Sequence, residues 1–120
     1  MFHSLLFPRV RNNTQNNARA DIYDGGNHYL LQIDAVGFSK EDIELSATTN
    51  SLKIEANKEK ELPKGYTPLY NSHKKDQRIH RNFRFRDSID ADGVEAHITH
   101  GLLNIKVPKR SARKIDIQVH

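Results

Sequence analysis

Seven histidines, a few paired aspartates and a run of arginines are the side chains of this chain that could do chemistry. His97 and His100 are the closest histidine pair, and on a strand a spacing of three points two side chains to opposite faces. We interpret them as surface residues rather than metal ligands. Asp90 and Asp92 flank a predicted turn, where aspartate is favoured for backbone reasons, so we do not expect an acid/base pair.

Other signatures of catalysis or cofactor binding are missing from the sequence. The chain has no cysteine, which excludes disulfides, a thiolate nucleophile and Cys-ligated zinc and is compatible with a reducing compartment. It also has no GxxxxGK[ST] phosphate-binding loop. We therefore expect no enzymatic activity, no metal and no cofactor.

Arg81 lies where a permanent charge is costly. By two-residue parity it shares a face with Ile79, Phe83 and Phe85, so its side chain points to the apolar side of a strand. A buried guanidinium needs a carboxylate or hydrogen-bond partners, and we expect Arg81 to be paired within the fold or across a subunit contact. The alternative is a bulge that rotates it outward, or a strand that starts later.

The arginines also suggest a nucleic-acid-binding module. Arg81, Arg84 and Arg86 interleave with Phe83 and Phe85, and basic residues beside aromatic rings can bind single strands. Parity, however, places both phenylalanines on the core face, away from Arg84. We keep a basic single-stranded nucleic-acid-binding β-module as the alternative function and expect no nucleic acid.

Composition predicts one soluble domain in the cytoplasm. The 120 residues suit a single domain, and no apolar run approaches the roughly 20 residues that cross a bilayer, so we expect no membrane. Met1 to Phe7 lacks the pattern of a secretory signal. The net charge of +4 comes from 19 Lys and Arg against 15 Asp and Glu. Much of the excess lies at Lys106, Lys109, Arg110, Arg113 and Lys114, which we interpret as a solvated linker.

The segments that position these residues have the sequence pattern of short strands. Apolar residues alternate in several runs, separated by turn residues at Gly25-Gly26, Thr49-Asn50, Asp90 to Gly93 and Gly101. The runs centre on Ile22, on Tyr29 to Ala35, on Ile43 to Ala47, on Leu52 to Ala56, on Ile79 to Phe85, on Val94 to Ile98 and on Leu103 to Val107. Only the hydroxyl of Ser39 suggests a cap for one helical turn. The pattern predicts an all-β sandwich.

Three segments fall outside this pattern. Residues 1–19 combine an apolar cluster with an Asn-rich stretch and read as a flexible arm. Between Lys58 and Arg78 the alternation stops at Pro63, Gly65 and Pro68, which predicts a long loop. The apolar residues expected in this loop are Tyr66, Leu69 and Tyr70.

The tail, residues 109–120, ends in Ile115, Ile117 and Val119 at a spacing of two. Such a strip is too short for a helix and would bind weakly alone, but several tails acting between subunits gain through effective concentration. The alternative is a last strand that folds back on its own domain.

In the order of its motifs, the chain resembles the small heat-shock proteins of the Hsp20/α-crystallin family, bacterial type. The run from His80, HRNFRFRDSIDADGVEAHITHGLLNIKVPK, is similar to the end of an α-crystallin domain, with an Arg before an aromatic strand and a Gly-x-Leu turn before Val-Pro. NHYLLQIDAVGFSKEDIEL and LKIEANKEKE are similar to its first half. Arg86 stands where the family usually has Pro, and His100 where it often has Asn.

The resemblance implies an immunoglobulin-like sandwich over residues 20–108 and an ATP-independent holdase that keeps unfolding proteins soluble. It implies a homo-oligomer built from dimers, with the 58–78 loop carrying a strand exchanged with the partner. Non-native client proteins would be handed to ATP-driven chaperones.

The same resemblance assigns roles to particular residues. The implied dimer interface is Arg81 with Tyr66, Leu69 and Tyr70. Ile115 and Ile117, with Val119, match an anchor that docks in a neighbour's groove walled by Leu45, Val94, Ala96 and Ile98. The expected client-binding arm is Phe2, Leu5, Leu6 and Phe7.

Overall fold

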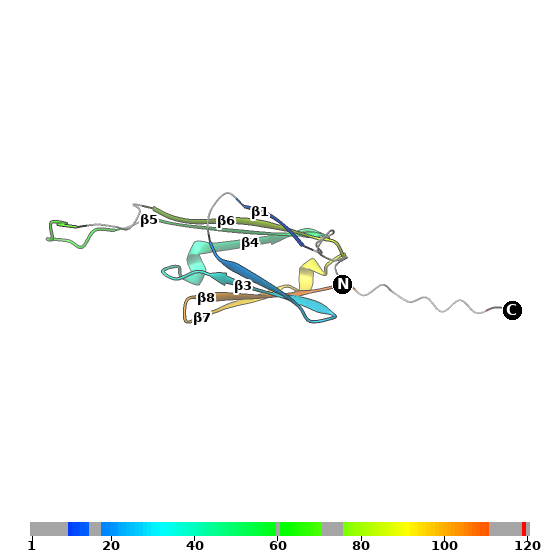
Figure 1. Ribbon diagram of the computed structural model, residues 1–120. Coiled ribbons are helices and arrows are strands. Elements are labelled where there is room, and N and C mark those ends of the chain that lie inside the picture. The colour runs from blue at the N-terminus through cyan, green and yellow to red at the C-terminus, as the bar shows by residue number, and fades with distance from the viewer. Residues whose placement is uncertain (1–9, 15–17, 60, 71–75, 111–118, 120) are drawn as a thin grey trace.

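Two four-stranded antiparallel sheets pack face to face in the computed structural model (Figure 1). The structure describes residues 10–14, 18–59, 61–70, 76–110 and 119. The first sheet has the order β1-β6-β5-β4 and the second has the order β2-β3-β8-β7. This all-β sandwich is the predicted fold class.

The eight strands of the described part of the chain are joined by turns and two short 3₁₀ helices. In the first sheet they are β1 (Val10–Thr14), β4 (Ile43–Ala47), β5 (Ser51–Glu59) and β6 (Asp76–Phe85). In the second they are β2 (Ala20–Asp24), β3 (His28–Asp34), β7 (Glu95–Thr99) and β8 (Leu102–Pro108). The 3₁₀ helices are η1 (Lys40–Asp42) and η2 (Ala91–Gly93). No helix among these residues is long and apolar enough to cross a membrane.

The core lies between the sheets and is built by the alternation that the sequence shows. On the central strands every second residue is buried, because successive side chains of a strand point to opposite faces. The largest fully buried side chains include Tyr29, Phe83, Leu31, Ile33, Leu52, Ile54, Ile89, Ile105 and Val107. Tyr29 stacks on Phe85 with ring centroids 4.8 Å apart, which joins the two sheets at one end.

The turn between β7 and β8 contains His100, one of the two residues at which this chain differs from the family pattern that it resembles. Thr99 pairs with Leu102, so His100 and Gly101 form a two-residue hairpin loop. Both have a positive φ, 52° at His100 and 77° at Gly101, as a type I′ turn requires. Asn-Gly is the preferred pair for this turn, and histidine adopts the left-handed region at a cost.

Replacing His100 with Asn should therefore stabilise the domain. We expect His100→Asn to raise the free energy of unfolding by up to about 1 kcal/mol, measured by chemical denaturation. His97→Asn makes the same substitution in β7, where asparagine is a poor strand former, and should lower it slightly. Shifts of the same sign in both variants would refute the turn explanation.

Two boundaries in the first sheet differ from the sequence prediction. Residues 10–14, predicted as part of a flexible arm, form β1 on the edge of β6. The predicted 58–78 loop is shorter at both ends, because Lys58 pairs with Gln77 and Glu59 with Asp76. These pairs are polar, so no apolar alternation marks them in the sequence. Cross-strand pairing alone extends the hairpin over these residues.

The predicted turn before β4 is present as η1, with Ser39 at its N-cap in a capping box with Asp42. The Ser39 hydroxyl donates to a carboxylate oxygen of Asp42 over 3.1 Å, and the Ser39 backbone N–H donates to the same oxygen over 2.9 Å. The Ser39 backbone hydrogen bond is the largest cause that holds the pKa of Asp42 below its ordinary value of 3.8. Asp42 thus fixes the approach to the end strand β4.

This geometry predicts a pH-dependent role for Asp42. A lowered pKa in the folded state stabilises the fold above pH 3.8, and this contribution is lost as the pH falls through the lowered value. Asp42→Asn should therefore be less stable than wild type at pH 7, and the difference should shrink below pH 3.8 in denaturation curves. Glu41→Gln removes a neighbouring charge and leaves the Ser39 contacts intact, so it is the matched control. A difference for Asp42→Asn that is independent of pH would contradict the assignment.

Candidate functional site

Arg81 is the buried charge of the described core. It is 6% exposed on β6, on the same side as Ile79 and Phe83, as parity predicts. The register of β6 against β5 is continuous across it, so the alternative of a bulge that turns it outward is wrong. Burial lowers the pKa of its guanidinium below the ordinary value for arginine.

The Arg81 guanidinium has partners within its own chain. It donates a hydrogen bond from Nη1 to the backbone oxygen of Ala18, and its Cζ lies 5.0 Å from the centroid of the Phe83 ring. A hydrogen bond to a carbonyl and a cation–π contact both offset the desolvation of a buried charge. Arg81 therefore ties the segment that precedes β2 to the opposite sheet.

The four predicted groove residues lie on or next to the end strands β4 and β7. Leu45 on β4 and Val94 and Ile98 beside or on β7 are half-buried and pack against the same core. Ala96 is different, because it is exposed on β7. Its register partner Ile105 is buried, and β7 is the end strand of its sheet, so no further strand covers Ala96.

The long loop carries four of the seven exposed large apolar side chains of the described residues. Figure 1 shows it extending beyond the sandwich from the β5-β6 hairpin. Tyr66 is 76% exposed, Leu69 97% and Tyr70 87%. Leu62, which the sequence reading overlooked as part of the loop's apolar content, is 55% exposed. Exposed apolar side chains of this size make the loop a candidate interaction surface.

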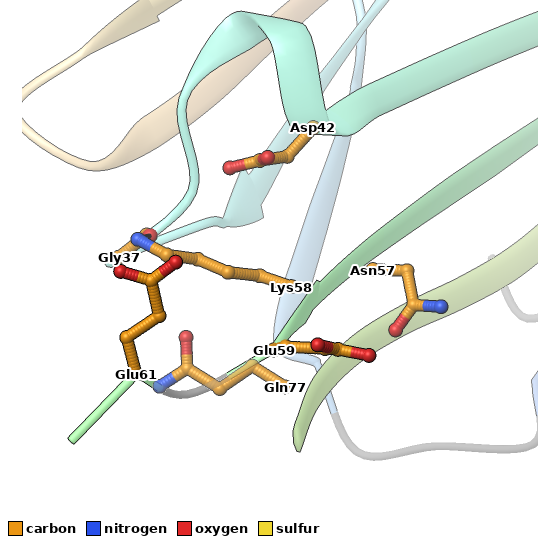
Figure 2. A pocket seen from close by; sticks show the side chains of 7 residues that line it. All are labelled: Gly37, Asp42, Asn57, Lys58, Glu59, Glu61 and Gln77. Atoms are coloured by element: carbon orange, nitrogen blue, oxygen red, sulfur yellow. Dashed lines mark hydrogen bonds between the residues drawn. The ribbon is translucent and has the colours of Figure 1, made fainter. Parts of the chain in front are cut away.

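A polar pocket of about 730 Å³ lies at the root of this loop (Figure 2). It is lined by Gly37, Asp42, Asn57, Lys58, Glu59, Glu61 and Gln77. In Figure 2 the Lys58 side chain reaches across the pocket, and its Nζ donates to the Gly37 oxygen over 2.7 Å. Lys58 thus braces the end of the hairpin against the turn after β3. The sequence pattern gave no signal for this contact.

A second polar cluster, here called the tail root, surrounds Lys109 at the end of β8. Its Nζ lies 2.8 Å from an Asp24 oxygen, 3.9 Å from an Asp87 oxygen and 4.6 Å from the centroid of the Tyr29 ring. The Tyr29 hydroxyl donates to Asp87 over 3.0 Å. Backbone bonds from Lys109 to Asn27 and from Arg110 to Ser88 continue the pairing.

The tail root corrects the reading of Lys109 as part of a solvated linker. Its side chain is only 14% exposed. Lys106 is exposed, but it lies on β8 and not in a linker. The difference arises because the end of β2 and the segment after β6 each bring an aspartate to Lys109, a convergence that no sequence spacing shows. The folded body therefore extends to residue 110, two residues beyond the predicted boundary.

Lys109→Met tests whether the tail root stabilises the domain. We expect a loss of about 1–2 kcal/mol in the free energy of unfolding, since the variant removes a cation–π contact and a mostly buried ion pair. Lys53→Met is the matched control, because the pair of Lys53 with Glu55 spans 3.5 Å with side chains 47% and 41% exposed. It should cost at most about 0.5 kcal/mol. Equal losses in the two variants would contradict a special role for Lys109.

The residues considered for catalysis lie in two places along the chain. His97 lies on β7 and His100 in the following turn, and Asp90 and Asp92 lie before and within η2. Within the described ranges, no three His, Cys, Asp or Glu side chains are grouped so that they could hold a metal ion.

The aromatic residues considered for nucleic-acid stacking are buried. Phe83 is 0% and Phe85 4% exposed, while Arg84 and Arg86 are exposed. These two rings therefore offer no stacking face to a base.

Two predicted sites fall wholly or largely outside the residues that the structure describes. These are the client-binding arm, with Phe2, Leu5, Leu6 and Phe7, and the tail anchor, with Ile115 and Ile117. Val119, the described residue of the tail anchor, is 94% exposed.

Comparison with known proteins gives a consistent picture. The Hsp20/alpha crystallin family matches residues 21–120. The small heat shock protein C4 of Rickettsia felis is 29% identical over 120 residues, which cover 95% of this chain and 72% of that protein. The 17.6 kDa class I heat shock protein 1 of Arabidopsis thaliana is 26% identical over 119 residues, which cover 98% of this chain and 77% of that protein.

Solved structures agree in fold. The small heat-shock protein of Xylella fastidiosa superposes with a TM-score of 0.70 at 33% identity, covering 88% of this chain and 98% of that one. Heat shock protein 16.0 of Schizosaccharomyces pombe has a TM-score of 0.71 at 23% identity, covering 100% and 98% of the two chains, and is similar in fold.

Proposed function

This chain belongs to the Hsp20/alpha crystallin family, and from that premise we propose that it is an ATP-independent holdase of the cytoplasm. The observation that carries the proposal is the family match over residues 21–120, which spans the sandwich from β2 to β8. The mechanism is passive: exposed apolar surface binds apolar segments of unfolding proteins, and burial of that surface supplies the free energy. It involves no enzymatic step and no cofactor. Bound clients pass to ATP-driven chaperones.

In this proposal the tail joins subunits. Ile115, Ile117 and Val119 of one chain insert between β4 and β7 of another. The receiving residues are Leu45, Val94, Ala96 and Ile98. The half-burial of three of these side chains supports the site, because an apolar strip laid on them would complete their burial. Each anchor side chain gains up to about 1.5–3 kcal/mol before ordering costs, so one tail binds weakly and several bind as a group.

The loop forms the dimer in the same proposal. Tyr66, Leu69 and Tyr70 pack on a partner subunit, which removes their large apolar surface from water. Arg81 supports this contact by holding the neighbouring backbone at Ala18 in place. The relative from Xylella fastidiosa has a distinct high-order structure, and we expect dimers of this chain to assemble further through their tails.

The arm supplies the first contact with clients. Phe2, Leu5, Leu6 and Phe7 concentrate large apolar side chains in a short segment, the composition that binds exposed apolar surface of an unfolding protein.

Light scattering from a heat-labile enzyme, without ATP, tests the function. We expect the wild-type chain to suppress aggregation, and Ile115→Ala/Ile117→Ala to form smaller assemblies on a sizing column because truncation removes most of the buried tail surface. Gln118→Ala, a polar position of the same tail, should assemble as wild type. Failure of the wild-type chain to suppress aggregation in excess over the enzyme would refute the holdase function and favour a test of salt-sensitive oligonucleotide binding.

A further inference from the structure

β1 lies on the edge of β6, where it is the outermost strand of its sheet (Figure 1). Its register places Asn13 opposite Asn82 and Asn12 opposite Phe83. On its other side β6 pairs with β5 along nine residues, against five for β1. β1 is therefore the shorter and more easily removed neighbour of β6.

The backbone groups that β1 covers follow from strand alternation. Phe85 donates its N–H to Asn50, toward β5, and successive residues of a strand direct their N–H and C=O groups to opposite sides. The N–H and C=O groups of Asn82 and Arg84 consequently face β1. Without β1 these groups form an open edge, and an open edge is a template for any extended chain.

The sequence of β1 is poorly suited to hold this position. It reads VRNNT, and asparagine is depleted in strands, so pairing of this segment is intrinsically weak. The chain just after β1 is held independently, because Arg81 binds the Ala18 oxygen. β1 can leave the edge while Ala18 and β2 keep their places.

We propose that β1 is a removable cover, and that the uncovered edge of β6 binds an extended segment of a non-native protein by backbone pairing. This inference rests on the proposed holdase function and names its client as an unfolded, strand-forming segment. Main-chain hydrogen bonds supply affinity without sequence specificity, which suits a protein that meets many clients. A β-branched or aromatic residue opposite Phe83 gains more from pairing than Asn12 does.

The charge on this part of the sheet favours a client segment over a second copy of β6. Arg78 and Arg84 are exposed on β6, and Lys53 is exposed on β5 directly opposite Asn82. Two β6 edges paired with each other would bring arginines of like charge together, which destabilises a pair. A segment whose alternate residues are neutral or acidic avoids this repulsion.

Because the chain has no cysteine, introduced thiols can lock the cover selectively. Asn13→Cys/Asn82→Cys places thiols on opposed residues of β1 and β6, to be bridged by a short bifunctional thiol reagent or capped separately. The probe is fluorescent, reduced and alkylated α-lactalbumin, which stays unfolded, and its Kd is measured by anisotropy. We expect the bridged form to bind at least about tenfold more weakly than the capped form.

A second locked pair controls for the chemistry. Glu95→Cys/Lys106→Cys opposes thiols on β7 and β8, away from β6, and bridging it should leave the Kd unchanged. Equal affinity of the bridged and capped β1 variants would overturn the cover while leaving the holdase function intact. Binding by none of the forms, with no suppression of aggregation by wild type, would instead refute the holdase function itself.

Hydrogen exchange locates the binding independently of affinity. In wild type the Asn82 and Arg84 amides should exchange faster than the Phe83 amide, and they should become protected when the probe binds. No change at these two amides on probe binding overturns the proposal. Protection that rises with protein concentration in the absence of probe would assign the edge to a second copy of the chain instead.

Discussion

The two open sheets of this protein bury their inner faces against each other but leave four end strands, and the rest of the structure depends on this constraint. Here the end strands are β1 and β4 in one sheet and β2 and β7 in the other. End strands carry backbone groups and half-buried side chains that seek partners. Two of the proposed contacts of this chain use these strands. The tail is assigned to β4 and β7, and client segments are assigned to the β6 edge beneath β1.

Long basic side chains fix the segments that leave the sandwich. Arg81 binds the Ala18 oxygen before β2, Lys58 binds the Gly37 oxygen below the loop, and Lys109 meets two aspartates and a tyrosine ring where the tail begins. Each joins elements far apart in the sequence. In each case a long, flexible side chain places its charged group beside a carbonyl or carboxylate oxygen. This contact fixes the backbone at the point where a segment leaves the sandwich.

Much of the fold could be predicted because the central strands alternate strongly. Seven of the eight described strands, the hairpin turns and the inward direction of Arg81 follow from two-residue parity. β1 could not be predicted, since VRNNT has neither the alternation nor the composition of a strand and is placed only by the β6 edge. The polar ends of β5 and β6 could not be predicted either, because pairing across the hairpin orders them and no apolar alternation marks them.

The sequence by itself determined the sandwich, its core face, the apolar loop and the family resemblance, because these depend on local periodicity and on motif order along the chain. Only the tertiary structure decided which polar groups contact each other. Lys109 reads as one charge in a basic tail until Asp24 and Asp87 converge on it. Ser39 reads as a cap, and the fold adds the Asp42 carboxylate that accepts its hydrogen bonds. That Ala96 is exposed, whereas Val94 and Ile98 are half-buried, follows from the fold and not from the sequence pattern. The physical reason is that burial and pairing depend on neighbours from distant segments, which a one-dimensional pattern does not contain.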